Sequence, residues 1–299
     1  MSNTQSDRET ETATPSTTRT LLLTGITLIA FAANSVLCRQ ALGGEHIDPV
    51  GFTAIRLLSG AVMLTILISL KAKPTRQSIL KNGSWQSAAA LLIYAITFSY
   101  AYVSLDAGAG ALILFAAVQA TMIGVGIWRG DRPGLIEWLG MATAMGGLVY
   151  LLSPGLNAPT AIGAALMAVS GMAWGLYSLY GRGERKPTAA TAGNFIRAAP
   201  FMLLLALFSW PELHGDIDGL LLAIASGALA SGIGYAIWYA ALPGLAPSIA
   251  ATVQLTVPAI AAAGGILFLD ETATLRLLLA GALILGGVAI AIQARRHDS

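Results

Sequence analysis

The sequence predicts an all-α integral membrane protein with ten transmembrane helices, arranged as two inverted five-helix repeats. Three observations support this fold class. The 299-residue chain is 56% hydrophobic and only 11% charged, whereas about 25% of the residues in an ordinary soluble domain are charged. Ten apolar stretches each approach the ~20 residues that a helix needs to cross a bilayer. The two halves of the chain also carry matching residues at a similar offset.

The first five apolar stretches follow a polar N-terminal tail. Residues 1–20 contain ten Ser or Thr together with three acidic residues, a composition typical of a disordered segment. The next run, from Leu21, has a matching segment later in the chain, so we interpret it as a transmembrane helix and not as a signal peptide. Hydrophilic breaks then separate the predicted helices 21–42, 49–71, 84–104, 108–128 and 134–153.

The second half repeats this pattern. Short breaks separate the predicted helices 160–181, 188–209, 218–241, 245–268 and 272–293. Pro258 interrupts helical hydrogen bonding in the fourth of these, so we expect a kink there. Strands are not expected, because the apolar runs are about twice as long as a barrel strand and do not alternate in polarity.

Lys and Arg residues gather in alternate breaks, which sets the orientation in the membrane. With the N-terminus inside, the inner breaks hold nine basic residues: Lys71, Lys73, Arg76, Lys81, Arg129, Arg132, Arg182, Arg185 and Lys186. The outer breaks hold no Lys or Arg but carry Glu45, Asp48, Asp106, Glu212, Asp216, Asp218, Asp270 and Glu271. Because short basic loops stay in the cytoplasm, we expect a multi-pass protein of the bacterial inner (plasma) membrane with both termini cytoplasmic.

Matching residues in the two halves indicate an internal repeat. The matched segments are Ile55-Arg56 with Ile196-Arg197, Tyr102 with Tyr239, Gln119 with Gln254, and Gly146-Gly147 with Gly286-Gly287. Each half contains five helices, an odd number, so the second half must enter the membrane from the opposite side. Inverted repeats are typical of secondary transporters, whose substrate site lies near the midplane between the halves. The predicted organisation is a cytoplasmic tail (1–20), two repeats (21–153 and 154–293) and a second cytoplasmic tail (294–299).

Two motifs near the C-terminus resemble a known family. The segments Phe268-Leu269-Asp270-Glu271-Thr272 and Gly281-Ala282-Leu283-Ile284-Leu285-Gly286-Gly287-Val288 are similar to the end of the EamA repeat of the drug/metabolite transporter superfamily. The resemblance implies a ten-helix carrier with two inverted five-helix repeats. Among the relatives, the chain is most similar to the YddG-type aromatic amino acid exporters. The first half departs from the family pattern at Asn34-Ser35, where a Trp-Gly pair is usual.

The predicted membrane interior holds few groups capable of acid-base chemistry. No Asp, Glu or His lies deep in a predicted helix, so we expect neither a carboxylate proton relay nor a counter-ion for a cationic cargo. Ser170, Ser178 and Ser231 have no His or acid at their depth to activate them as nucleophiles, so an enzyme is not expected. The single cysteine, Cys38, excludes an intrachain disulfide and a cysteine metal cluster. We expect no cofactor, no metal and no nucleic-acid partner.

Uncharged hydrogen-bonding groups and aromatic rings remain near the middle of the predicted helices. The candidate substrate-binding residues are Asn34, Tyr94, Phe98, Tyr102, Gln119, Trp174, Tyr177, Tyr235, Trp238, Tyr239 and Gln254. A spacing of four places Tyr94, Phe98 and Tyr102 on one helix face, and a Tyr hydroxyl needs a partner when it is buried. The alternatives are helix–helix hydrogen bonds for the amides and ordinary packing or lipid contact for the rings.

Arg56 and Arg197 are repeat partners about two turns into their predicted helices. Such residues usually snorkel to the interface or pair with helix-end carbonyl groups. Contact with a substrate carboxylate is the alternative, and the sequence leaves both interpretations open.

These residues favour a secondary transporter that moves a small amphipathic metabolite by alternating access. An aromatic wall with amide groups suits an amino acid, with aromatic ones preferred, and the resemblance implies export. The alternatives are a carrier of the same fold for another neutral metabolite, such as a sugar derivative or a nucleobase, and a non-transporting membrane enzyme or scaffold. The expected partners are the small-molecule substrate and the lipid bilayer, and a monomer suffices to complete the pathway.

Overall fold

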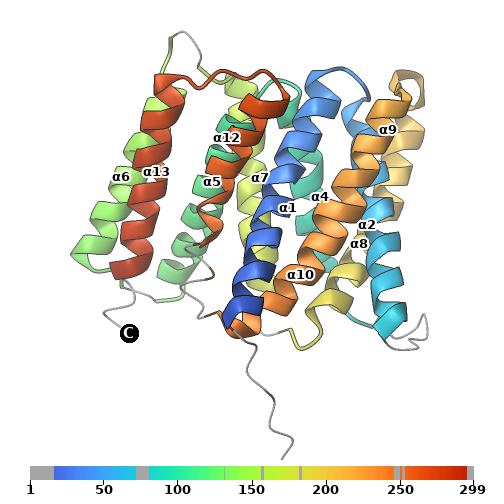
Figure 1. The fold of residues 1–299 in the computed structure, drawn as a ribbon, viewed down its shortest axis with the longest axis horizontal. Coiled ribbons are helices and arrows are strands. Elements are labelled where there is room, and N and C mark those ends of the chain that lie inside the picture. Colours follow the sequence, from blue (N-terminus) through green and yellow to red (C-terminus); the bar gives the residue numbers. More distant parts are fainter. Residues whose placement is uncertain are drawn as a thin grey trace, which may run out of the picture.

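The helices lie close to their predicted positions. The computed structural model describes residues 17–71, 81–130, 132–155, 158–181, 184–245, 250 and 253–294. The first half contains α1 (Thr17–Gly43), α2 (Pro49–Lys71), α4 (Trp85–Tyr102), α5 (Ala107–Trp128) and α6 (Leu135–Leu152). The second half contains α7 (Ala161–Tyr180), α8 (Pro187–Phe208), η1 (Trp210–Glu212), α9 (Ile217–Ile224), η2 (Ala225–Ile233), α10 (Gly234–Ala241), η3 (Leu242–Gly244), α12 (Val257–Phe268) and α13 (Leu275–Ala294). Figure 1 shows them side by side, running between two ends of one bundle.

Most of these helices have the length and composition of membrane spans. Among the described residues, eight helical runs are long and apolar enough to cross a membrane, with α9, η2, α10 and η3 counted as one run. α12 is shorter, with 12 residues. α4 has 18 residues but is less apolar, because it carries several Tyr and Ser residues that it buries inside the bundle. The predicted all-α membrane fold is confirmed.

Contacts between the helices follow the pseudo-two-fold symmetry of an inverted repeat. Three helices pack directly on their own repeat partners: α6 on α13, α5 on α12, and α2 on α8. The contact of α4 with α7 corresponds to that of α10 with α1, and the contact of α5 with α7 to that of α12 with α1. Successive helices alternate in direction, so α1 and α7, the first helices of the two halves, run in opposite directions in Figure 1. This arrangement places α1, α4, α7 and α10 at the centre of the bundle.

The eighth predicted helix contains a π-helix that the sequence did not predict. α9, η2 and α10 form one continuous run, in which η2 is a π-helix of nine residues. The tight packing of η2 on α2 requires small residues, because a Cβ on Gly227 would collide with the Arg56 carbonyl oxygen and the Ser59 hydroxyl. π-Helical turns are frequent at functional sites. The wide turn brings the second half directly against Arg56 of the first half.

The prediction of one continuous helix over 245–268 is wrong. Residues 246–249 and 251–252 lie outside the described residues, and a turn at 255–256 separates helical Gln254 from α12. Pro258 therefore does not kink a helix but stands in the first turn of α12. Its missing N–H costs little there, because the first N–H groups of a helix have no intrahelical partner. Discontinuous helices commonly form the substrate site in transporters.

The described basic residues of the inner breaks gather at one end of the bundle. Lys81, Arg129, Arg132, Arg185 and Lys186 lie in the connections that follow α2, α5 and α7. In Figure 1 these three helices end on the side where α1 begins and α13 ends. The other predicted inner residues, Lys73, Arg76 and Arg182, and most of both predicted tails lie outside the described residues, as does the side chain of Lys71. The assignment of this end to the cytoplasm stays a prediction.

At the opposite end, the loop after α1 joins the loop before α9. Ile47 and Gly215 form an isolated antiparallel bridge. The Asp48 carboxylate accepts a hydrogen bond from the His214 backbone N–H at 3.2 Å, and the Asp48 N–H donates to the His214 carbonyl at 3.1 Å. These contacts connect the two repeats near the predicted outer surface.

The exposed pair of His46 and Asp216 strengthens this connection in a pH-dependent manner. His46 Nδ1 lies 2.8 Å from Asp216 Oδ2. The hydrogen bond to Asp216 raises the pKa of His46 above its ordinary value of 6.5. The pKa of Asp216 is lowered from 3.8, first by the Gly219 N–H and then by His46. The stabilisation by His46 is therefore complete below its unfolded-state pKa and is lost as pH rises through the raised folded-state pKa.

We expect the melting temperature to respond to pH accordingly. Between about pH 5.5 and about pH 8 it falls more steeply in the wild type than in His46→Gln, because the variant has no proton to lose at this position. Asp216 does not contribute to the slope in this range, since its lowered pKa lies far below it. The effect is small because both groups are exposed. Thermal melts of the two proteins over this pH range measure it, and parallel curves contradict the assignment.

Candidate functional site

A small cavity lies between the two repeats, near the middle of their helices. It is lined by Phe31, Asn34, Ser35, Tyr94, Phe98, Leu114, Phe115, Trp174, Ala230, Ser231, Tyr235 and Gln254. α1, α4 and α5 of the first half and α7, η2, α10 and the segment before α12 of the second half provide these side chains. The cavity volume is about 30 Å³, about the share of one water molecule in liquid water. A metabolite therefore fits only after the surrounding helices or rings move apart.

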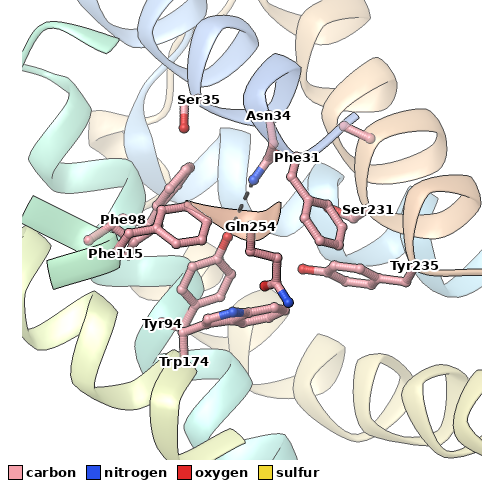
Figure 2. A pocket seen from close by; sticks show the side chains of 12 residues that line it. Phe31, Asn34, Ser35, Tyr94, Phe98, Phe115, Trp174, Ser231, Tyr235 and Gln254 are labelled. Carbon is pink, nitrogen blue, oxygen red and sulfur yellow. Dashed lines mark hydrogen bonds between the residues drawn. The ribbon is translucent and has the colours of Figure 1, made fainter. Parts of the chain in front are cut away.

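Aromatic rings form one wall of the cavity. The Trp174 ring stacks on Tyr235, with centroids 5.5 Å apart, and its centroid lies 4.8 Å from that of Tyr94. Phe31 meets Tyr235 edge-on at 5.6 Å. Figure 2 shows these rings arranged around the side-chain amide of Gln254. The wall offers both ring faces and hydroxyl groups to a bound molecule.

Asn34 and Tyr94 form a polar corner of the cavity. The Asn34 Nδ2 donates to the Tyr94 hydroxyl oxygen at 3.3 Å (Figure 2), and Asn34 Oδ1 accepts from the Ser226 hydroxyl of η2 at 2.6 Å. Both ends of this buried amide are thus satisfied, as burial of a polar group requires. The bond to Ser226 fixes which end of the amide faces Tyr94.

Arg56 lies directly behind this corner. Its side chain is 1% exposed, and its Nη2 donates to the Tyr94 hydroxyl oxygen at 2.9 Å. The guanidinium carbon lies 5.2 Å from the Tyr94 ring centroid and 5.0 Å from that of Phe98, within range of cation–π attraction. Within the described part of the chain, Nε and Nη1 have no hydrogen-bond partner. The snorkelling interpretation is wrong for Arg56, because its side chain turns into the bundle.

Arg197, the repeat partner of Arg56, is placed differently. Its Nη1 donates to the carbonyl groups of Asn82 at 2.7 Å and Gly193 at 3.0 Å. Its guanidinium carbon lies 5.8 Å from the ring centroid of Trp85, which is exposed at the start of α4. Arg197 therefore pairs with backbone carbonyl groups near the bundle end, as one of the sequence interpretations expected.

Two further polar side chains face the cavity from the second half. The Ser231 hydroxyl of η2 is buried and has no hydrogen-bond partner among the described residues. Gln254 Nε2 donates to the Ala250 carbonyl at 3.3 Å, and no described residue donates to its amide oxygen. Unsatisfied hydrogen-bonding capacity inside a cavity is what a polar ligand would use.

The predicted residues divide between the cavity and its surroundings. Six of the eleven line it: Asn34, Tyr94, Phe98, Trp174, Tyr235 and Gln254. The other five lie outside its lining: Tyr102, Gln119, Tyr177, Trp238 and Tyr239.

These five residues occupy neighbouring layers. Tyr102 is fully buried and donates to the Ala107 carbonyl at 3.3 Å. Tyr177 and Tyr239 both contact the Thr191 hydroxyl, at 3.4 and 3.2 Å, in a polar cluster against α8. Trp238 packs against Phe31. Gln119 is partly exposed, one turn beyond Phe115 on the same face of α5.

Sequence reasoning missed six lining residues: Phe31, Ser35, Leu114, Phe115, Ala230 and Ser231. Helical spacing carried a signal for two of them, since Phe31 precedes Asn34 by three residues and Phe115 precedes Gln119 by four, so each shares a helix face with a predicted residue. For Ala230 and Ser231 the decisive feature is the π-helix, which changes the direction of side chains after its wide turn.

An ionic cluster joins the halves on the side of the cavity away from the chain ends. Arg39 lies 3.7 Å from Asp106 and 3.7 Å from Glu271. The Glu271 carboxylate also accepts from the Ala107 N–H, at 2.8 and 3.1 Å, and so caps the N-terminus of α5. Burial raises the pKa of Glu271, and the bond from Ala107 opposes this shift. Through Glu271, the Phe268–Thr272 motif therefore links the second repeat to the first.

One group of possible metal ligands occurs among the described residues. His46, Asp216 and Asp218 have ligand atoms within 4.8 Å of one another, with both carboxylates exposed. His46 and Asp216 lie in the surface loops described above and Asp218 in the first turn of α9, and none of the three lines the cavity. The cavity itself offers amide, hydroxyl and aromatic groups, which suit binding of an organic solute.

Inverted repeats that surround a cavity with polar groups at mid-bundle define a membrane transporter of small metabolites. The fold and the cavity both follow this plan. The chain belongs to the EamA-like transporter family, whose model matches residues 18–153 and 161–293. The two matched segments correspond to the two five-helix halves.

Curated relatives and a solved structure resemble the chain over most of its length. An uncharacterised protein of Pseudomonas aeruginosa, PA1977, is 52% identical over 93% of this chain and 96% of its own. The threonine/homoserine exporter RhtA of Escherichia coli strain K12 is 28% identical, with 83% of each chain covered. One crystal structure superposes with a TM-score of 0.65 at 21% identity, over 92% of this chain and 99% of its own; at this identity it supports the fold alone.

Proposed function

We propose that this protein exports amino acids across the bacterial inner membrane by alternating access. The observation that carries the proposal is a cavity with an amide and hydroxyl corner at Asn34 and Tyr94 and a stacked aromatic wall at Trp174 and Tyr235. An amino acid has both a strongly polar backbone and a side chain of variable polarity. The name of the RhtA relatives, threonine/homoserine exporters, supports the same class of cargo and the outward direction.

In the proposed cycle the two repeats rock around the cavity. Contacts on both sides of it join the halves: the Arg39–Glu271 pair on one side and, on the other, the hydrogen bond from the Ser84 N–H to Asn194 Oδ1. Each set would open in turn while the other stays closed. The inner-membrane location with cytoplasmic termini is part of this proposal, and it rests on the distribution of the basic residues.

The side chain of the cargo has two candidate classes. Aromatic amino acids are the first, because Phe31, Trp174 and Tyr235 would stack on a ring. Small hydroxylated amino acids are the second, because the Ser231 hydroxyl and the Gln254 amide that face the cavity would bond to a side-chain hydroxyl. A transport panel separates the two.

Reconstituted protein in liposomes tests the function. We expect saturable uptake of labelled Phe, Thr or homoserine that is accelerated by the same amino acid on the opposite side, and no uptake of glucose or uracil. Gln254→Ala should lower the uptake of the preferred amino acid about tenfold, because the amide is lost from the cavity.

Gln293→Ala provides the matched control, since it removes an exposed amide of α13 outside the cavity. Its uptake should equal that of the wild type. Uptake of uracil or glucose instead of any amino acid would contradict the proposed cargo. Equal uptake by Gln254→Ala and the wild type would remove Gln254 from the site.

A further inference from the structure

Arg56 is a buried cation that no acidic side chain in the described part of the chain neutralises. Within the described residues it forms no ion pair with an acidic side chain, and its Nε and Nη1 have no hydrogen-bond partner. A guanidinium group stays charged under all ordinary conditions. A buried charge without a partner destabilises a protein, and inside a membrane such groups usually serve function.

Arg197, at the equivalent position of the second repeat, shows that this fold can provide hydrogen-bond acceptors for such an arginine. Arg197 donates to the carbonyl groups of Asn82 and Gly193. Arg56 has instead one hydroxyl oxygen and two ring faces. A substrate with one negatively charged group needs a counter-charge from only one of the two repeats. The difference between Arg56 and Arg197 meets this requirement.

The geometry between Arg56 and the cavity favours an anionic ligand. The Tyr94 hydroxyl oxygen accepts from Arg56 Nη2 at 2.9 Å and from Asn34 Nδ2 at 3.3 Å. A hydroxyl has two acceptor sites and one proton to donate. Both acceptor sites are used, so the Tyr94 proton is left to donate toward the cavity that this residue lines. A ligand oxygen entering here meets donors only: the Tyr94 O–H, the Asn34 N–H and the guanidinium behind them.

We propose that Arg56 is the counter-charge for the carboxylate of the cargo, which binds at the corner formed by Tyr94 and Asn34. This proposal extends the proposed function. It requires only that the cargo carries a carboxylate, and it rests on the proposed function for the ammonium group and the side chain. A carboxylate accepts through both oxygens, so it can satisfy the Tyr94 proton and one of the free guanidinium N–H groups together once the cavity opens. The neighbouring ring faces of Trp174 and Tyr235 suit the ammonium group of an amino acid.

The binding test compares acids with their uncharged analogues. The probes are L-threonine and L-phenylalanine, the carboxamides of both, and 3-phenylpropionate, which has a carboxylate and no amine. Thermal stabilisation of the full-length protein in detergent and competition for uptake in liposomes are measured with each probe. We expect the wild type to bind an acid at least about tenfold more tightly than its carboxamide, because the amide lacks the charge.

Variants at the two arginines show which of them causes the preference for an acid over its carboxamide. Arg56→Gln should bind acid and carboxamide equally, whereas Arg56→Lys keeps a preference for the acid. Arg197→Gln, the matched control, keeps the full preference, because Arg197 bonds to backbone groups. In the absence of ligand, Arg56→Gln should melt at or above the wild-type temperature, since it removes an uncompensated charge. Loss of a purely structural arginine would lower the melting temperature and leave the preference unchanged.

The outcomes separate this proposal from the function proposed above. An undiminished preference for acids in Arg56→Gln overturns the role of Arg56 and leaves amino acid export intact. If only 3-phenylpropionate binds, and does so through Arg56, amino acids are excluded as cargo while the carboxylate site stands. Should Arg56→Gln fail to fold, Arg56→Lys decides, and equal binding of acid and carboxamide by that variant also overturns the proposal.

Discussion

Gly287→Ala is expected to lower the stability of the protein by about 2 kcal/mol or more, whereas Gly286→Ala leaves it unchanged. α13 packs on α6 so closely that a Cβ on Gly287 would lie 2.5 Å from the Ala144 nitrogen and 2.5 Å from the Gly140 carbonyl oxygen. Backbone atoms cannot move aside as the end of a side chain can, so the two helices must separate. A Cβ on Gly286 meets no atom within 4 Å. The two adjacent glycines therefore form a matched pair, because they differ in that only Gly287 contacts α6.

The inverted repeat supplies an internal replicate of this prediction. A Cβ on Gly147 of α6 would lie 2.7 Å from the Leu283 Cβ and 3.0 Å from the Ile284 nitrogen, and a Cβ on Gly146 would meet nothing within 4 Å. Gly147→Ala should therefore destabilise and Gly146→Ala should not. Thermal melts in detergent of the four variants measure this. Equal melting temperatures within either pair would show that α6 and α13 do not pack as described.

The glycine pairs illustrate what the sequence could and could not predict about the fold. Their recurrence in both halves indicated the repeat, and the apolar runs located the helices to within a few residues. A repeated Gly-Gly pair does not reveal which of its members faces the partner helix, because that depends on the rotation of α6 and α13 about their axes. The π-helix η2 and the break before α12 were missed for a similar reason, since both depend on packing against other helices and not on local composition.

The candidate site was predicted in part because its polar members carry a signal in isolation. Asn34 and Gln254 are unusual within apolar segments, and the aromatic spacing identified Tyr94 and Tyr235. Leu114 and Ala230 have no such signal, because apolar residues are common on every helix face. Tyr177 and Tyr239 were included by the same reasoning as Tyr94, but in the structure they bond to Thr191 and lie outside the lining.

Arg56 was the position at which a general rule failed. Arginines near a helix end usually extend to the membrane surface, and Arg197 has the carbonyl partners that this rule allows. Whether an arginine turns inward depends on its neighbours. Here the rings of Tyr94 and Phe98 enclose the Arg56 guanidinium, and Gly227 of η2 packs on the Arg56 backbone; none of these contacts is local in sequence.

Asn34→Asp is expected to raise the melting temperature and to lower uptake of the preferred amino acid at least about tenfold. The new carboxylate keeps the acceptor for the Ser226 hydroxyl, which already bonds to Asn34 Oδ1 at 2.6 Å. Its second oxygen replaces the Nδ2 group and accepts the proton of Tyr94, whose oxygen bonds to Arg56. The fixed negative charge thus neutralises Arg56 from within the chain and repels the carboxylate of the cargo from the same corner.

A double-mutant cycle isolates the charge effect from the change in shape. In the Arg56→Gln background the aspartate has no counter-charge, so Asn34→Asp should there lower the melting temperature instead of raising it. The coupling energy between the two positions should be about 2 kcal/mol. Asn34→Leu removes the amide without adding charge, so it should weaken transport without the gain in stability. If Asn34→Asp destabilises both backgrounds equally, Arg56 does not act on the Asn34 corner, and the buried cation must be neutralised elsewhere.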